Sequence, residues 1–115
     1  HHHFHGRCMK VLPELAALGL DCNCPFERPP GGDVTDLKRV HELLAEKVTF
    51  NGNVHTVDTL IRGKPSDVRR EVMEILEAFL GSPRLIIGTG DQVGWDTPEE
   101  NIAAMIETAR QYGKQ

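Results

Sequence analysis

Apolar and polar residues alternate along this chain with two different periods, which predict helices and strands in turn. Apolar residues recur at the helical spacing of three or four, and this pattern predicts helices near residues 10–18, 33–44, 66–80 and 97–112. A shorter helix is predicted around residues 57–61. Residues 20–26, 48–50 and 85–87 predict strands, and the first few residues predict the end of a fourth strand.

Several local signals refine these elements. Asp33 is expected to cap the helix that follows it, and Thr97-Pro98 predicts an N-cap followed by the first helical position. The run 85–87 is typical of a parallel strand buried on both faces. Cys22 and Cys24 lie on the apolar phase of their strand, so we expect them to pack in the core.

The order of helices and strands predicts the fold class. Strands that alternate with helices form βα units around a parallel sheet, so we expect an α/β fold with about four such units. No linker-like stretch interrupts the series, and residues 1–115 are therefore expected to form one domain.

Composition and charge exclude some function classes. The formal net charge of −4 comes without a basic cluster, which argues against a nucleic-acid partner. No apolar run approaches the roughly 20 residues of a membrane-spanning helix. Three cysteines without redox or zinc-ribbon spacing fit a reduced, cytoplasmic setting.

The histidines at the start of the chain have two interpretations. His1 and His2 are expected to be the remnant of a purification tag, because the chain begins in histidines without an initiator methionine. Alternatively, the run contains the start of a metal site. The choice depends on whether His3 and His5 belong to the protein's own sequence. Ordinary sequence resumes at His5.

Polar residues gather where the predicted strands end. Because the carboxyl ends of parallel strands meet at one edge of a sheet, we expect these side chains to share a pocket. Glu27 could instead pair with Arg28, and the asparagines could serve only a turn. The residues at these strand ends are His3, His5, Glu27, Asn51, Asn53, His55, Gly90 and Asp91.

Five segments in order resemble the C-terminal half of the uroporphyrinogen decarboxylase superfamily. They are His3-Phe4-His5-Gly6, Leu20-Asp21 leading to Pro25-Phe26-Glu27, Lys47 to Asn53, Gly63 to Val68, and Gly88-Thr89-Gly90 through Asp96 to Asn101. The resemblance covers nearly all of the chain but about a third of a full member. It implies a TIM (β/α)8 barrel, of which this chain is the C-terminal half.

The resemblance also implies chemistry, and here the chain departs from the family pattern. The corrinoid-dependent methyltransferases of the superfamily hold zinc with a His-x-Cys pair and a later cysteine, and the matching positions here are His3, His5 and Asp91. Imidazoles and a carboxylate suit Zn²⁺, and Glu27 or His55 could complete the set. In the decarboxylases the last position is a histidine that contacts substrate propionates, which a carboxylate at Asp91 would repel.

From the resemblance we expect the intact protein to be a zinc-dependent methyltransferase that works with a corrinoid protein. Glu27 and Asp91 would be catalytic, and a small-molecule substrate would contact Asn51, Asn53, His55 and Gly90. One alternative is a uroporphyrinogen decarboxylase of porphyrin biosynthesis, which needs no cofactor; another is a non-catalytic binding module. The half-barrel alone is expected to be inactive and to need an N-terminal half-barrel, or a second copy as a homodimer, to cover its edges.

Overall fold

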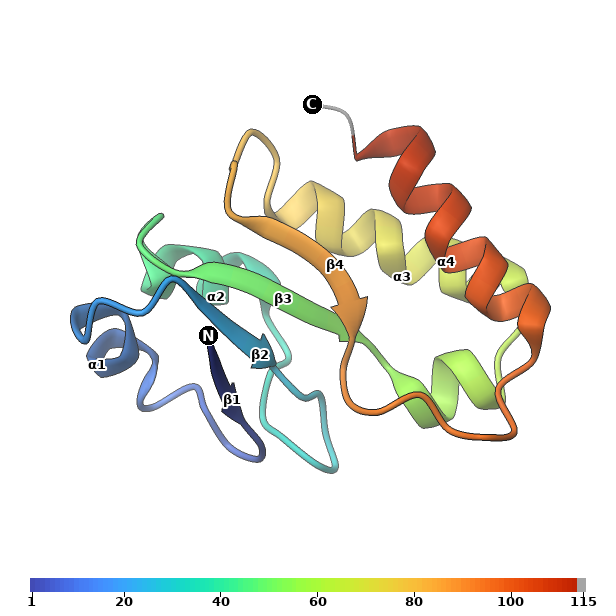
Figure 1. The fold of residues 1–115 in the computed structure, drawn as a ribbon, viewed down its shortest axis with the longest axis horizontal. Coiled ribbons are helices and arrows are strands. Elements are labelled where there is room, and N and C mark those ends of the chain that lie inside the picture. Colours follow the sequence, from blue (N-terminus) through green and yellow to red (C-terminus); the bar gives the residue numbers. More distant parts are fainter. Residues whose placement is uncertain (114–115) are drawn as a thin grey trace.

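A parallel sheet lies in front of a layer of helices in the computed structural model, which describes residues 1–113 (Figure 1). Strands and helices alternate along the chain, as the sequence predicts. The strands are β1 (His2–Phe4), β2 (Cys22–Pro25), β3 (Thr49–Val54) and β4 (Leu85–Thr89). The helices are α1 (Leu12–Ala17), α2 (Leu37–Leu44), α3 (Pro65–Ala78) and α4 (Glu99–Tyr112), with a short π-helix, η1 (Thr56–Ile61), after β3.

The four strands lie side by side in chain order. Every neighbouring pair is parallel, so all four carboxyl ends lie at the same edge of the sheet. Strands β1 and β4 each pair on one side only. This is the arrangement of a half-barrel, and it confirms the predicted α/β class with four parallel βα units.

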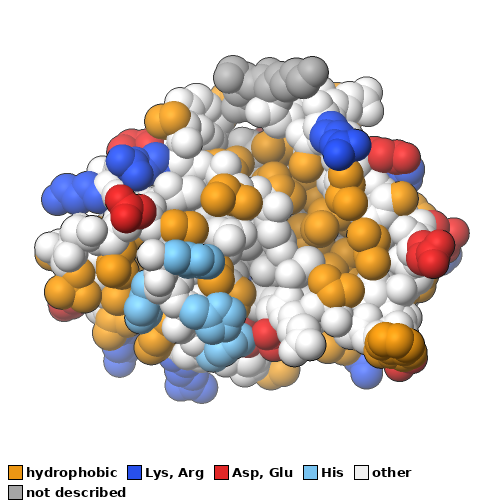
Figure 2. Space-filling view, in the orientation of Figure 1, with side chains coloured by type: hydrophobic (Ala, Val, Ile, Leu, Met, Phe, Trp, Pro, Cys, Tyr) orange, Lys and Arg blue, Asp and Glu red, His pale blue; other side chains and the backbone are white. Residues whose placement is uncertain are grey.

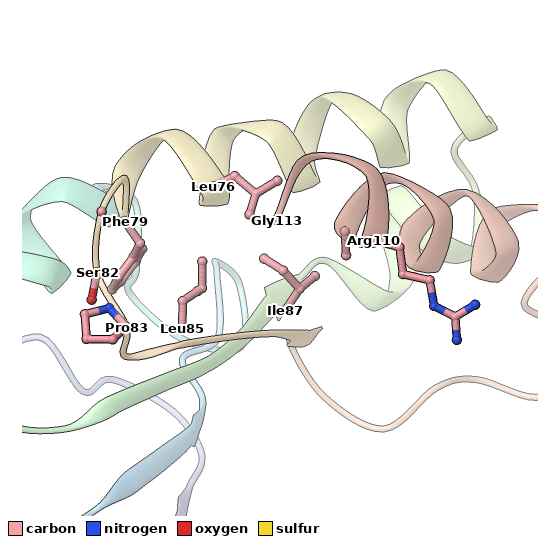
Figure 3. Close-up of a pocket in the computed structure, with 10 residues that line it drawn as sticks. Leu76, Phe79, Ser82, Pro83, Leu85, Ile87, Arg110 and Gly113 are labelled. Carbon is pink, nitrogen blue, oxygen red and sulfur yellow. The ribbon is translucent and has the colours of Figure 1, made fainter. Parts of the chain in front are cut away.

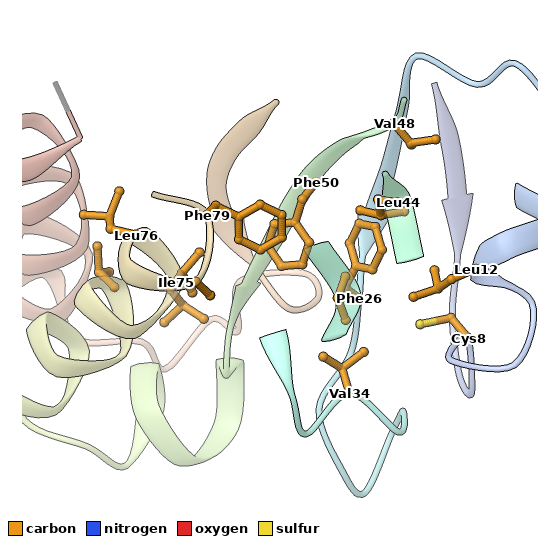
Figure 4. Packing of buried hydrophobic residues seen from close by; sticks show 14 of the residues in the cluster. Cys8, Leu12, Phe26, Val34, Leu44, Val48, Phe50, Ile75, Leu76 and Phe79 are labelled. Carbon is orange, nitrogen blue, oxygen red and sulfur yellow. The ribbon is translucent and has the colours of Figure 1, made fainter. Parts of the chain in front are cut away.

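A stack of three aromatic rings forms the centre of the core (Figure 4). Phe50 of β3 is fully buried, with its ring 4.5 Å from that of Phe26 and 4.6 Å from that of Phe79. The stack therefore joins the segment after β2, the start of β3 and the end of α3. Aliphatic side chains from α2 and α3, including Val40, Leu44, Val72 and Ile75, fill the space around it.

The helix starts differ from the predicted caps. Asp36, not Asp33, is the N-cap of α2, and its side chain accepts a hydrogen bond from the Arg39 amide at 3.0 Å. Asp33 instead accepts the amides of Cys8 and Met9 at 2.9 and 3.1 Å, which ties the loop before α2 to the start of the chain. At α4 the N-cap is Pro98, one residue later than predicted.

One face of the sheet is not covered by the chain's own helices; we call it the open face. His3 pairs in register with Cys24, Asn51 pairs with Ile86, and these residues form a row across the sheet. Ile86 is 48% exposed, so the prediction that β4 is buried on both faces is wrong. Figure 2 shows histidine side chains and hydrophobic side chains on this side of the molecule.

The predicted burial of Cys22 and Cys24 is also wrong. Both are only partly buried, whereas Asn23 between them is 1% exposed on the opposite face. Asn23 tolerates burial because its Oδ1 lies 2.6 Å from His2 Nδ1, which satisfies the amide oxygen. The phase of β2 therefore places its thiols on the open face.

Glu46, a carboxylate near the amino ends of the strands, makes the free energy of unfolding depend on pH in the acidic range. Hydrogen bonds with His41 and then Ser82 hold the pKa of Glu46 below its ordinary value. A lowered pKa stabilises the fold above the ordinary value, and this contribution is lost as the pH falls through the folded pKa. Because Glu46 is 47% exposed, the contribution is expected to be below about 1 kcal/mol.

When the pH is lowered from about 5 to about 3, the free energy of unfolding is accordingly expected to fall less for Glu46→Gln than for the unsubstituted chain. Urea unfolding at each pH measures this. Glu107→Gln, at an exposed position of α4, is the control and should follow the unsubstituted chain. Identical acid profiles for all three proteins would contradict the role of Glu46.

Within residues 1–113, no helix combines the length and the apolar character needed to cross a membrane.

Candidate functional site

His5 lies at the centre of a group of polar side chains beyond the carboxyl ends of the strands. It follows directly after β1, and the chain then turns at Gly6 with φ +92°, a left-handed conformation that favours glycine. The Gly6 amide donates a hydrogen bond of 2.6 Å to Glu27 Oε2. The turn after β1 therefore fixes the carboxylate that faces His5.

Glu27 follows β2, and a close backbone approach holds it in place. A Cβ at Gly32 would lie 2.1 Å from the Glu27 carbonyl oxygen, so only glycine fits there. The same carbonyl accepts the Val34 amide at 3.1 Å. The loop after β2 thus folds back on Glu27 and restricts where its side chain can go.

Asp91 follows β4 at the same edge of the sheet. Its Oδ1 accepts the Gln92 amide at 2.7 Å, and its carbonyl accepts the Thr89 hydroxyl at 2.6 Å. These bonds form a tight turn that points the carboxylate back towards the end of β1.

The three side chains converge. One ligand atom from each of His5, Glu27 and Asp91 can be chosen so that all three atoms lie within 4.8 Å of one another. His5 Nδ1 is 3.3 Å from Glu27 Oε1, and His5 Nε2 is 3.9 Å from Asp91 Oδ1. His5 and Asp91 are half exposed and Glu27 is largely buried. One imidazole and two carboxylates in this arrangement can hold a divalent cation.

His3 lies beside this group rather than within it. Its Nε2 is 2.7 Å from His5 Nε2, and its Nδ1 is 3.1 Å from Cys24 Sγ. Of the predicted ligands His3, His5 and Asp91, the structure brings the last two together with Glu27. The contact between His3 and Cys24 was not foreseen, because the sequence does not show which face of β2 is open.

A pocket of about 200 Å³ adjoins the three side chains, and Glu27 and Asp91 form part of its wall. Three of the four predicted substrate-binding residues, Asn53, His55 and Gly90, also line it. Asn51 does not: its Oδ1 would be 2.5 Å from a Cβ at Gly88, so its side chain lies over that glycine on the open face.

Asn53 and His55 differ in which of their side-chain hydrogen-bonding atoms have a partner. Asn53 is fully buried and donates to the Phe26 carbonyl at 2.9 Å, while among the described residues its Oδ1 has no partner. His55 accepts the Asp58 amide at Nδ1 at 3.1 Å, and its Nε2 is 3.2 Å from the Pro29 carbonyl. Both ring nitrogens of His55 are thus engaged with the backbone, which disfavours His55 as a metal ligand.

A buried carboxylate on α3 holds two walls of the pocket together. Glu71 Oε1 is 2.9 Å from Arg28 Nε and accepts the His55 amide at 3.1 Å. Its side chain is 8% exposed. Arg28 therefore pairs with Glu71 and not with Glu27, which leaves the Glu27 carboxylate for the site.

Glu71→Gln is expected to destabilise the chain by about 1–2 kcal/mol, because it removes the charge from a buried carboxylate that pairs with Arg28 and accepts the His55 amide. The control is Glu74→Gln, since Glu74 is 51% exposed and 3.8 Å from Arg28 Nη2. It should cost less than about 0.5 kcal/mol. Denaturant unfolding measures both, and equal effects would contradict the role of Glu71.

A larger hollow of about 520 Å³ lies between β4, α3 and the end of α4 (Figure 3). Its wall includes Leu76, Phe79, Leu85 and Ile87, and among residues 1–113 the charged residue that lines it is Arg110. It contains none of the predicted site residues. The smaller pocket at the strand ends is therefore the candidate site.

Cys8 is not part of the site. It is 1% exposed, and burial, with a further contribution from Asp33, raises the pKa of its thiol to about 11. Cys8 therefore stays a neutral core residue.

Comparisons with known proteins agree on one family. The family model described as uroporphyrinogen decarboxylase (URO-D) matches residues 1–112. Uroporphyrinogen decarboxylases from Paraburkholderia phytofirmans and from Azoarcus sp. are each 25% identical over 104 residues, which is 90% of this chain and 26% of the relative. This chain thus spans about a quarter of the length of those relatives.

Among solved structures, a methyltransferase from Methanosarcina mazei is similar with a TM-score of 0.80 and 22% identity. The match covers 96% of this chain and 30% of that protein. At this identity the likeness shows the fold.

Proposed function

The chain belongs to the uroporphyrinogen decarboxylase family, and on that premise we propose that it forms the catalytic mouth of a zinc-dependent methyltransferase that works with a corrinoid protein. The observation that supports this most is the convergence of His5, Glu27 and Asp91 within 4.8 Å. Such a set has the donors that Zn²⁺ accepts and leaves a position for a substrate atom.

His5, Glu27 and Asp91 would hold the ion, and bound zinc would supply Lewis acidity that lowers the pKa of a substrate thiol or hydroxyl. The protein's own part is positioning. The Gly6 amide orients Glu27, and the Gln92 amide orients Asp91, so both carboxylates are fixed before a ligand arrives.

The pocket beside this set would hold the acceptor. Its small volume suits a small molecule, and its wall includes Asn53, whose Oδ1 has no partner among the described residues. Glu27 and Asp91 make the pocket acidic, and the nearby guanidinium of Arg28 is paired with Glu71.

This charge pattern bears on the alternative activity. The curated relatives are uroporphyrinogen decarboxylases, which favours decarboxylation as the second candidate. A polyanionic porphyrinogen would meet two carboxylates at this edge of the sheet, and like charges repel. We therefore place methyl transfer first.

The remainder of the barrel would come from outside this chain. Within residues 1–113, strands β1 and β4 each pair with a strand on one side only, and the chain spans about a quarter of the length of its curated relatives. We propose that an N-terminal half-barrel covers these edges and the open face, with self-association of two copies as the alternative.

The test uses the full-length product of the gene that encodes this chain. Zinc-loaded protein, methylcobalamin and a small thiol are mixed, and loss of the methyl group from cobalamin is followed by absorbance. Transfer is expected, and Asp91→Asn should slow it at least about 100-fold while Asp96→Asn, in the same loop, should not. Decarboxylation of uroporphyrinogen without methyl transfer would overturn the proposal in favour of the decarboxylase. Absence of both reactions would favour a binding module.

A further inference from the structure

Two cationic side chains line another hollow at the carboxyl edge of the sheet, which we call the basic pocket. It has a volume of about 510 Å³, and its walls come from the loops after β1 and β2. Arg7 and Lys10 belong to the first loop, and Thr35 belongs to the second. Within residues 1–113, Arg7 and Lys10 are both exposed, and neither forms an ion pair or a side-chain hydrogen bond. Their charges are therefore available to a ligand.

Hydrogen bonds fix the two walls of the basic pocket relative to each other. Asp33 Oδ1, in the second loop, accepts the amides of Cys8 and Met9 in the first loop at 2.9 and 3.1 Å. The second loop is also closed on itself, because the Gly32 amide donates to the Arg28 carbonyl at 3.0 Å. Since the loops are tied together before a ligand arrives, less conformational freedom is lost when one binds.

The lining of the basic pocket is positive although one acidic residue belongs to it. Arg7 and Lys10 supply two positive charges against the one negative charge of Asp33, whose Oδ1 already accepts two backbone amides. Glu27 does not line this pocket. Its Oε1 would lie 3.1 Å from a Cβ at Gly31, and both residues line the neighbouring pocket of about 200 Å³. An anion is therefore the ligand that the basic pocket favours.

The donor groups fit a phosphate better than a carboxylate. A guanidinium binds two oxygens of one anion side by side, and an ammonium and a hydroxyl each donate further hydrogen bonds. Arg7, Lys10 and Thr35 together serve three oxygens, whereas a carboxylate has two. The two cations also match the charge of about −2 that a phosphate group carries near neutral pH.

We propose that Arg7, Lys10 and Thr35 form an anion site that binds the phosphate group of a small molecule. Binding consists of charge-assisted hydrogen bonds from the guanidinium and the ammonium, together with one from the hydroxyl. The site uses none of the side chains of the candidate metal set.

The basic pocket adjoins the candidate site. Pro30 lines both the basic pocket and the pocket of about 200 Å³ whose wall includes Glu27 and Asp91. A molecule held by its phosphate therefore extends over Pro30 towards the two carboxylates. In methyl transfer the acceptor would then be a small molecule with a phosphate group. Only this last consequence rests on the proposed function.

Titration of the metal-free chain with inorganic phosphate, followed by ¹H–¹⁵N NMR at about pH 7, tests the anion site. We expect the amide signals of residues 7–10 and 32–35 to shift and to saturate with a dissociation constant of about 1 mM. Acetate, titrated in the same way, should bind at least about tenfold more weakly, because it has one charge and two oxygens.

Variants of the two cations test the assignment to these residues. Arg7→Gln and Lys10→Gln should each weaken phosphate binding at least about tenfold, because each removes a charged donor. Arg69→Gln and Lys38→Gln are the matched controls, since both residues are exposed on helices and lie outside the basic pocket. Both controls should bind phosphate as the unsubstituted chain does.

Asp91→Asn separates this inference from the proposed function, since it should bind phosphate normally even if zinc binding and methyl transfer fail. Unchanged phosphate affinity in Arg7→Gln or Lys10→Gln would overturn the assignment. So would equal affinity for acetate, shifts confined to other residues, or no saturation below about 20 mM phosphate.

Discussion

Phe50→Ala is expected to lower the free energy of unfolding by about 3–5 kcal/mol, the usual cost of truncating a fully buried phenylalanine. The ring is 0% exposed and contacts both Phe26 and Phe79. Its removal leaves a cavity at the point where β2, β3 and α3 meet. Denaturant unfolding followed by far-ultraviolet circular dichroism measures the loss.

Two further variants keep this prediction testable if Phe50→Ala does not fold. Phe50→Leu retains most of the volume and should cost less than Phe50→Ala, about 1–2 kcal/mol. Leu80→Ala, at a position 69% exposed, should change stability by less than about 0.5 kcal/mol. A Phe50→Leu variant as stable as the unsubstituted chain would contradict the central place of the aromatic stack.

Asp91→Asn is expected to weaken zinc binding at least about 100-fold, which corresponds to about 2.7 kcal/mol of binding free energy. An amide oxygen carries no charge, so the set of His5, Glu27 and Asp91 would lose one of its two anionic donors. The measurement is a competition titration against a coloured chelator. It is made in a Cys24→Ser background, so that zinc bound to the thiol does not contribute.

Asp96→Asn in the same background is the matched control, because it removes the same charge from the same loop and lies outside the converging set. It should bind zinc as the parent does. Equal affinity of the Asp91→Asn variant and its parent would show that Asp91 is not a ligand.

Much of the fold could be predicted from the sequence because βα alternation is a local signal. The continuous apolar run at β4 and the helical spacing in α3 each specify an element without reference to the rest of the chain. Chain order then places the carboxyl ends of parallel strands at one edge. The convergence of His5 and Asp91 with Glu27 follows from that topology, although their roles remain proposals.

Other features depend on contacts between distant residues. The strand β2 reads Cys-Asn-Cys-Pro, and hydrophobicity alone places the cysteines inside. The structure buries Asn23 instead, and His2 on the neighbouring strand satisfies its amide oxygen. Where a neighbouring strand can provide a polar partner on either face, the residues of a strand do not by themselves show which of its faces is buried.

The last helix shows the same effect. The spacing of Ile102, Met105 and Ile106 predicts α4, but the residues that it buries are Asn101, Ala104 and Thr108. Asn101 lies inside because its Nδ2 donates to the Leu60 and Gly63 carbonyls, both at 2.9 Å. These hydrogen bonds, to the end of η1 and to Gly63 just beyond it, explain why the Asn101 face of α4 is turned inward.

Anomalous diffraction from crystals of the Cys24→Ser chain loaded with one equivalent of zinc tests the central claim most directly. The account predicts one zinc peak with His5 nitrogen, Glu27 oxygen and Asp91 oxygen at about 2.0–2.2 Å. A chain that takes up no zinc, or a zinc ion bound elsewhere with these three side chains free, would contradict the proposed metal centre and the methyl-transfer function that depends on it.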